Sequence, residues 1–242
     1  MKRLAALVLS GLVWAGAVAC AQEYALLTQT RTDQAKEGEV VLATRQASFP
    51  QVQGLANPQA QRMANQAIID TLQGEGGFEA ARDYALEDYQ ENPERFEGNA
   101  YGQDVTVQAA FQGKKLLCLN YEFVTDTGGP HPWTSRLGLL VDLTTGQPVP
   151  LAELFKEEGA ARALVNRELQ RQWEEKGPAL EGETLEAAHQ WGWEKALLTG
   201  EGLLIVYDPG EIGPVAQGAE EYTVGYDLLD REWGAWGGPQ DW

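Results

Sequence analysis

The segment DVTVQAAFQGKKLLCLNYEFVT, residues 104–125, carries the clearest structural pattern of the sequence. In its first half every second position is apolar, which predicts a strand with one buried face. These positions are Val105, Val107, Ala109 and Phe111. The dipeptide Gln112-Gly113 predicts a turn, and residues 116–125 supply a second strand. Together they predict a β-hairpin in the middle of the chain.

The downstream sequence adds strands and helices. A third strand is expected at residues 137–143. Residues 160–175 place their apolar side chains on one helical face, and residues 183–190 predict a shorter helical piece. The chain then returns to β-structure, with short strands at residues 196–198, 203–207 and 222–224.

The upstream sequence predicts a strand at residues 39–49 and then two helices. Asn57 is suited to cap the first helix and Pro58 to begin it, and the second helix covers residues 78–92. Residues 22–36 are polar, with a weak strand signal, and are expected to tether the domain. Because strands and helices do not alternate strictly, the sequence favours an α+β fold, with an antiparallel sheet packed against a few helices.

The N-terminus has the pattern of a secretory signal peptide, residues 1–19. The basic pair Lys2-Arg3 precedes an apolar run at residues 4–18, which is short for a membrane span of roughly 20 residues. Cleavage before Cys20, in a sequence that resembles a lipobox, would make Cys20 the lipidation site. Cleavage after Ala21 would release an unmodified chain. We favour cleavage before Cys20. Both alternatives predict an exported protein, periplasmic or extracellular, and in the favoured one it meets a membrane only through the lipid anchor on Cys20.

The composition is strongly acidic. The 242 residues include 36 acidic and 18 basic side chains, which gives a net charge of −18. Loss of Lys2 and Arg3 with the signal peptide leaves 16 basic residues and a net charge of −20. Nucleic acids and anionic membrane surfaces repel such a chain, so neither is an expected partner, whereas a cationic protein is. Solubility alone is an equally good explanation of the acidity.

The residue types that most often carry catalysis are scarce. Two histidines, His131 and His189, and a lone Cys118 in an apolar strand are too few for a zinc site. Neither Ser48 nor Ser135 lies in a GxSxG elbow, and no phosphate-binding glycine loop occurs. The many carboxylates are compatible with a glycosidase-like pair. We nevertheless expect no enzymatic activity, no cofactor and no metal, and we expect Cys118 to be a small buried hydrophobe.

The loop at residues 127–132, TGGPHP, is the densest special feature of the sequence. Gly128 and Gly129 permit unusual backbone angles, while the flanking prolines stiffen His131. Two interpretations are open. The loop is either a rigid connection in which His131 bonds a backbone carbonyl, or a surface that contacts a partner.

The sequence around this loop resembles the extracytoplasmic domain of RsiV-type anti-sigma factors. The resemblance rests on the order and spacing of several motifs, which are residues 121–123, 128–132, 141–146, 151–155, 202–204, 211–214 and 218. Upstream, residues 49–52, 55, 57 and 65–68 resemble the companion segment that precedes this domain in RsiV and in PdaC-type peptidoglycan deacetylases. The resemblance implies a companion α/β segment at residues 36–97, an RsiV-type domain at 98–230 and a Trp/Gly-rich tail at 231–242.

The resemblance also implies a function. In RsiV the domain binds lysozyme, so we expect a non-enzymatic binding or sensor module for a cationic protein such as lysozyme. The expected ligand contacts are Gly128, Gly129, Pro130, His131, Pro132, Pro209 and Glu211. The family often has an aromatic residue after the proline, where this chain has Gly210 and so lacks a large contact side chain. The alternative is a structural lipoprotein associated with peptidoglycan, because tryptophans in an exposed tail can stack on sugars. The other interpretation of the tail is that Trp233 and Trp236 fold back on the core.

Overall fold

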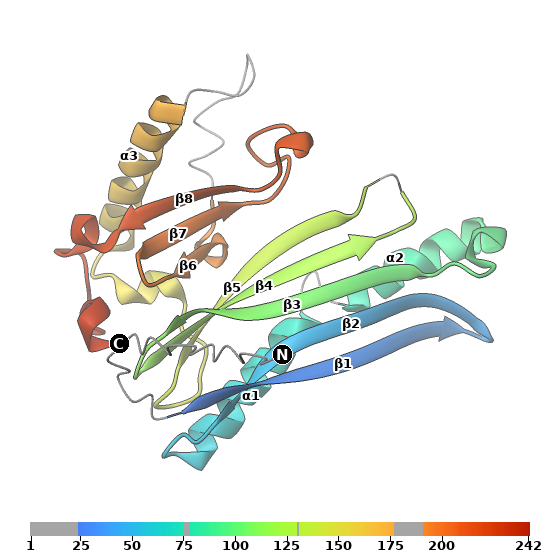
Figure 1. Ribbon diagram of the computed structural model, residues 1–242, viewed down its shortest axis with the longest axis horizontal. Coiled ribbons are helices and arrows are strands. Elements are labelled where there is room, and N and C mark those ends of the chain that lie inside the picture. Colours follow the sequence, from blue (N-terminus) through green and yellow to red (C-terminus); the bar gives the residue numbers. More distant parts are fainter. Residues whose placement is uncertain (1–23, 75–77, 130, 177–190) are drawn as a thin grey trace, which may run out of the picture.

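The computed structural model describes residues 24–74, 78–129, 131–176 and 191–242. Within these residues it has two β-sheets and three α-helices, which confirms the predicted α+β class (Figure 1). The predicted signal peptide, Cys20, Pro130 and the helix expected at residues 183–190 lie outside the described residues. In the described part, no helix is both long and apolar enough to cross a membrane.

Five strands form the larger sheet. They are β1 (Ala25–Glu37), β2 (Val40–Gln53), β3 (Tyr101–Gln112), β4 (Leu116–Asp126) and β5 (Trp133–Asp142), and they lie side by side in this order. The predicted hairpin at residues 104–125 is the antiparallel pair of β3 and β4. The strands β2 and β3, however, run parallel, so the sheet is mixed and not wholly antiparallel as expected.

The parallel pair results from the two helices that separate β2 from β3. Helices α1 (Pro58–Gln73) and α2 (Phe78–Glu91) carry the chain back along the sheet, so that β3 starts at the same end as β2. Parallel strands need such a crossover, whereas a hairpin joins antiparallel ones. The larger sheet therefore runs across the boundary expected between residues 97 and 98.

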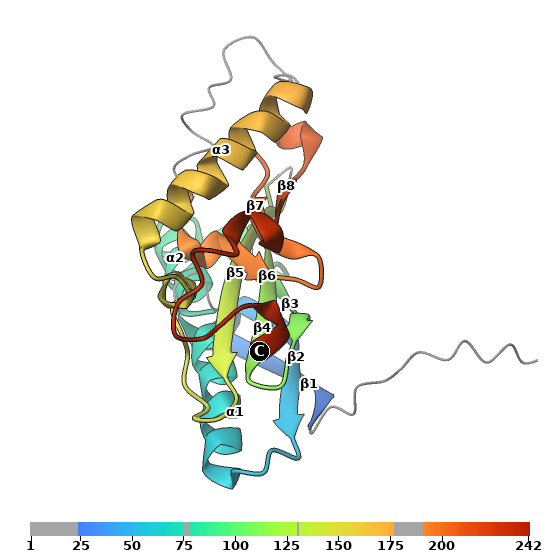
Figure 2. The same ribbon diagram turned by 90° about the vertical axis from the view of Figure 1, so that its left-hand side faces the viewer.

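Helix α1 begins at its predicted cap. The side-chain oxygen of Asn57 accepts hydrogen bonds from the N–H groups of Gln59 (3.0 Å) and Ala60 (3.3 Å), and Pro58 starts the helix. The buried face of α1 consists of Ala60, Ala64, Ala67, Ile68 and Leu72. This face packs on the larger sheet. Helices α1 and α2 together form a layer on one side of that sheet (Figure 2).

Strand β4 is enclosed on both faces. On one face Leu117, Leu119 and Tyr121 pack with α1 in what we call the helix-side core. On the other face Leu116 and Cys118 pack with the smaller sheet in the small-sheet core. A strand covered on both sides needs apolar residues at successive positions, which explains the unbroken apolar run at residues 116–119.

The smaller sheet consists of β6 (Ala196–Leu198), β7 (Gly202–Tyr207) and β8 (Glu220–Gly225), all antiparallel. Helix α3 (Glu158–Lys176) lies against it and buries one side-chain row, Ala161, Val165, Leu169 and Trp173. These elements lie close to the positions that the sequence predicted. Figure 1 shows that α3 and this sheet form a second layer beside strands β3, β4 and β5.

The C-terminal tail closes the small-sheet core. Trp233 and Trp242 are buried, and the Trp233 ring stacks on Phe155 with 5.0 Å between ring centroids. The carbonyl O of Trp242 accepts a hydrogen bond from the N–H of Lys114 (2.7 Å). Of the two interpretations of the tail tryptophans, the structure confirms the one in which they fold back on the core, with Trp236 partly buried against it.

Two further expectations differ from the structure. Residues 22–36 are expected as a tether, but β1 begins at Ala25 and forms the edge of the larger sheet. Phe111 is expected to share a face with Val105 and Val107. A bulge at Ala110 shifts the register, so Phe111 packs against the small-sheet core while both valines stay in the helix-side core.

Candidate functional site

The loop between β4 and β5 forms the tip of a hairpin. The side chain of Asp126 accepts a hydrogen bond from the N–H of Gly128 (2.7 Å), and Gly128 has a φ of 75°, which favours glycine. Arg95, from the short 3-10 helix Pro93–Phe96 after α2, donates a hydrogen bond to the carbonyl O of Thr127 (2.6 Å). These bonds fasten the loop to the segment that follows α2.

The predicted contact residues of this loop are exposed. Gly128, Gly129, His131 and Pro132 all lie at the surface, and Pro130 lies outside the described residues. Within the described residues His131 makes no hydrogen bond, so no described carbonyl holds its ring. The loop is therefore accessible, as a surface that contacts a partner requires.

Negative charge is concentrated beside this loop. Residues 78–97 hold seven carboxylates and two arginines, a net charge of −5. Both arginines are paired within the segment, Arg82 with Asp83 and Arg95 with Asp88. Five exposed carboxylates in it make no ion pair with any described residue. One is Glu79 in the first turn of α2, and we call the other four the acidic end: Glu87, Glu91, Glu94 and Glu97.

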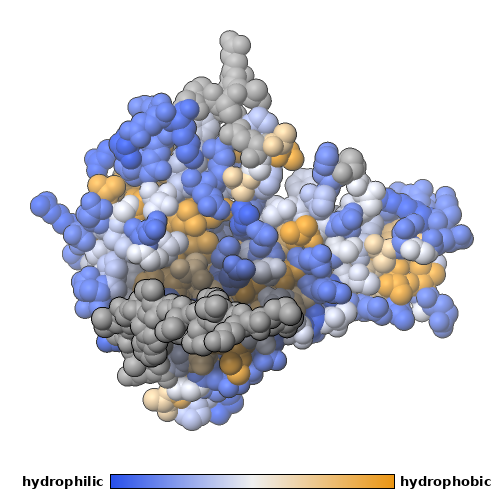
Figure 3. All heavy atoms as spheres, viewed as in Figure 1, coloured by the Kyte–Doolittle hydropathy of each residue, from blue (hydrophilic) through white to orange (hydrophobic). Residues whose placement is uncertain are grey.

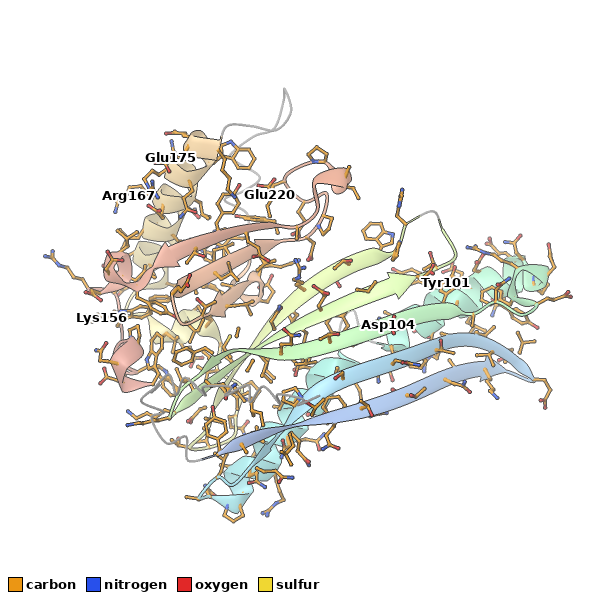
Figure 4. The ribbon with its side chains drawn as sticks, viewed as in Figure 1. Tyr101, Asp104, Lys156, Arg167, Glu175 and Glu220 are labelled. Atoms are coloured by element: carbon orange, nitrogen blue, oxygen red, sulfur yellow. The ribbon has the colours of Figure 1, made fainter. Side chains whose placement is uncertain are left out.

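The acidic end is held on the sheet by packing and by one hydrogen bond. Phe96 is buried between α2 and the strands, where its ring lies 5.6 Å from that of Tyr101. The Tyr101 hydroxyl donates a hydrogen bond to Asp88 (2.9 Å), and Figure 4 shows Tyr101 at the start of β3, beside α2. Hydrophilic residues cover most of this end of the molecule (Figure 3).

A groove lies next to the loop, between α2 and the start of β5. Its volume is about 440 Å³, and it is lined by Ala80, Ala81, Tyr84, Gln103, Thr125, Thr127, Trp133 and Ser135. The side chains of Tyr84 and Trp133 are 68% and 76% exposed. The helical layer leaves this part of the sheet face uncovered, so two aromatic rings reach solvent there.

The second predicted contact segment, after β7, is engaged within the protein. Asp208 is buried and accepts hydrogen bonds from the N–H of Arg136 on β5 (3.3 Å) and from the Lys195 ammonium. Glu211 accepts a hydrogen bond from the N–H of Asp208 (2.5 Å) and lies 3.4 Å from the Lys195 ammonium. Glu211 therefore has a structural role, and Asp208 joins this segment to β5, the strand that begins at the hairpin loop.

The backbone conformation explains why a glycine follows Pro209. Gly210 has a φ of 90°, and a Cβ atom there would lie 2.9 Å from Val215. A bulky residue would be strained in this backbone conformation. Residues 208–216 contain no aromatic side chain that could take the place of the missing one.

Reactive groups do not gather at these surfaces. In the described part, no group of three or more His, Cys, Asp or Glu side chains is placed to hold a metal ion. Cys118 is fully buried in the small-sheet core, and burial raises the pKa of its thiol to about 12. The prediction that Cys118 is a small buried hydrophobe is confirmed.

The sequence marks the loop but not the groove. The glycines and prolines of residues 127–132 marked the loop, because they restrict the backbone. Tyr84 and Trp133 gave no such signal, since a strand or helix pattern does not tell which part of a face stays uncovered. The exposed tryptophan is Trp133 at the start of β5, whereas Trp233 of the tail is buried.

The sequence matches no family model, and no curated protein matches it. Solved structures do match. A DUF3298 family member from Bacteroides fragilis aligns with a TM-score of 0.60 and 18% identity, over 91% of this chain and 96% of that one. A DUF3298 family protein from Pseudomonas aeruginosa aligns with a TM-score of 0.53 and 14% identity, over 88% of this chain and 94% of that one. By its α+β fold, the chain is structurally similar to the DUF3298 family proteins, the family of RsiV- and PdaC-type domains.

Proposed function

We propose that the protein is an exported, non-enzymatic binding module that captures a cationic protein at the acidic end and the adjoining β4–β5 loop. A lysozyme-type protein is the partner that the RsiV resemblance suggests. The signal-peptide pattern and Cys20 support a lipid-anchored location outside the cytoplasm. The observation that carries the proposal is the set of four exposed carboxylates without an ion partner among the described residues, Glu87, Glu91, Glu94 and Glu97.

The arrangement suits a cationic partner for two reasons. Uncompensated charges on one flank raise the rate at which an oppositely charged protein arrives. The loop beside them supplies His131 and Pro132, exposed groups that can make short-range contacts after arrival. Charge alone gives weak and salt-sensitive adhesion, because charges are screened beyond about 8 Å at physiological salt. Specific capture therefore needs both the carboxylates and the loop.

The experiment measures the affinity for hen lysozyme, as a cationic probe, across a salt series. The triple variant Glu87→Gln, Glu91→Gln, Glu94→Gln removes three negative charges from the acidic end. The control Glu157→Gln, Asp227→Asn, Asp230→Asn removes the same charge from exposed positions near α3 and β8. We expect the first variant to lower the association rate about tenfold at low salt and the control to change it little.

The loop is tested separately with His131→Ala and Pro132→Ala. If the loop is in contact, these changes raise the dissociation rate and leave the salt dependence unaltered. Equal losses in both triple variants would show that general acidity attracts the probe. Absence of binding at low salt would contradict the proposal and favour the peptidoglycan-associated lipoprotein without a protein ligand.

A further inference from the structure

We propose that the groove between α2 and β5 is a binding site for a neutral pyranose oligosaccharide, held between the rings of Trp133 and Tyr84. The site is distinct from the acidic end, and none of the residues that define the acidic end lines it. Its volume of about 440 Å³ lies within the range of small-ligand sites, roughly 300–1,000 Å³.

The strands build the floor of the groove in register. Gln103 on β3 pairs with Thr125 on β4, and Thr125 pairs with Trp133 on β5, so the three side chains form one row across the sheet. The Gln103 amide donates a hydrogen bond to the Thr125 hydroxyl (3.2 Å), which fixes both polar groups. Ser135, two residues along β5, shares the face of Trp133. The floor therefore offers the hydroxyl groups of Thr125 and Ser135, with the buried Gln103 amide holding Thr125 in place.

The walls of the groove are two aromatic side chains that the fold does not bury. Tyr84 stands on α2 and Trp133 at the first position of β5, and their exposed fractions are 68% and 76%. The tryptophans of the small-sheet core are buried instead, Trp173, Trp191, Trp233 and Trp242. An exposed indole forgoes the stabilisation that burial of an aromatic ring provides. A ring face left in solvent beside a polar floor can receive the apolar C–H face of a sugar.

The charge of the lining selects the ligand class. Every side chain that lines the groove is uncharged, in a chain of net charge −18. A lysine or arginine side chain of a partner would lose hydration there without a carboxylate in the lining to compensate it. A neutral sugar exchanges its water for hydroxyl partners and for aromatic contact. These features favour a saccharide over a cationic peptide.

The test titrates chitotetraose and cellotetraose, both neutral, and tetralysine as the cationic arm, and follows binding by calorimetry. We expect one or both sugars to bind, with Trp133→Ala raising the Kd about tenfold or more and Tyr84→Ala raising it less. Trp133→Phe, which keeps an aromatic face, should restore part of the affinity. The control Leu228→Ala removes an exposed apolar side chain elsewhere and should leave the Kd unchanged.

Two measurements separate this site from the proposed protein site. The Glu87, Glu91 and Glu94 triple variant should keep its sugar affinity, and Trp133→Ala should melt at the wild-type temperature because its indole is exposed. Failure of both sugars to bind at millimolar concentration would overturn the proposal. So would unchanged sugar binding in Trp133→Ala, or a Trp133-dependent binding of tetralysine in place of sugar.

Discussion

At the residue scale, the most constrained side chain is a charged one inside the protein. Arg45 on β2 is 2% exposed. Its guanidinium donates a hydrogen bond to the carbonyl O of Leu72 near the end of α1 (2.7 Å) and two to one carboxylate oxygen of Asp33 on β1 (2.7 and 3.0 Å). Its planar head also lies 5.2 Å from the centre of the Phe78 ring. Arg45 therefore connects β1, β2 and the junction of both helices.

Removal of the carboxylate should be costly. Asp33→Ala leaves a buried guanidinium without its anion, and we expect a loss of about 3 kcal/mol in the free energy of unfolding. Arg31→Gln, which removes the exposed partner of Asp33, should cost less than about 1 kcal/mol. Urea denaturation measures both. Equal midpoints for wild type and Asp33→Ala would show that Arg45 tolerates burial alone.

The carboxylate of Asp33 also makes the free energy of unfolding depend on pH. Burial raises the pKa of Asp33, but hydrogen bonds from Arg45 and Arg31 outweigh it and hold this pKa below its ordinary value. Its contribution is thus complete above the unfolded pKa of about 3.9 and is lost as the pH falls through the lower folded pKa. The difference between wild type and Asp33→Ala should therefore shrink at low pH.

At the element scale, one turn fixes how closely α1 approaches the sheet. Gly146, in the turn after β5, donates its N–H to the carbonyl O of Asp142 (2.7 Å) and has a φ of 78°. A Cβ atom at Gly146 would lie 2.1 Å from the carbonyl O of Ala60 in the first turn of α1. Helix α1 can lie this close to the turn because residue 146 has no side chain.

Gly146→Ala should therefore destabilise the protein by about 3 kcal/mol or more, since both the backbone conformation and backbone atoms of α1 oppose the methyl group. The matched control is Gly38→Ala. Gly38 also has a positive φ, 59°, but no atom lies within 4 Å of the place that a methyl group would take there, so we expect a loss of about 1 kcal/mol. Thermal melting compares the two. A similar loss in both variants would mean that the contact with α1 relaxes easily.

The elements also show what sequence patterns can and cannot predict. Asn57 and Pro58 located the start of α1, and the apolar run around Cys118 located β4, because caps and burial leave local signals. The direction of a strand leaves no local signal in the sequence, so the parallel pairing of β2 with β3 was not predicted. The sequence pattern also gave no indication of the bulge at Ala110. For the site, the loop was predictable from its glycines and prolines, whereas exposure of Trp133 depends on where α2 stops covering the sheet.

At the scale of the whole molecule, the two cores share a strand and should unfold together. Ile68 belongs to the helix-side core, whereas Trp173, Trp191, Trp233 and Trp242 belong to the small-sheet core. Strand β4 contributes side chains to both. Loss of one core removes packing from a strand that the other core needs.

Ile68→Ala should therefore shift the denaturation midpoint seen by tryptophan fluorescence, although none of the described tryptophans belongs to the helix-side core. We expect a loss of about 3 kcal/mol, typical of truncating a buried isoleucine. Circular dichroism should give the same midpoint. A fluorescence midpoint that stays at the wild-type value while the circular dichroism midpoint falls would show that the two cores unfold independently.

The crossover between β2 and β3 also sets an order of events during folding. Strands β1 and β2 are joined by Gly38 and Glu39 alone, whereas residues 54–100 separate β2 from β3. Because the entropy lost on closing a loop grows with its length, the local ribbons β1–β2 and β3–β4–β5 can form before they meet. We expect the parallel pairing of β2 with β3 to form last, when α1 and α2 bring the ribbons together. We therefore expect helix-breaking substitutions in α1 to slow the pairing of the two ribbons, because the crossover must form for β2 and β3 to meet.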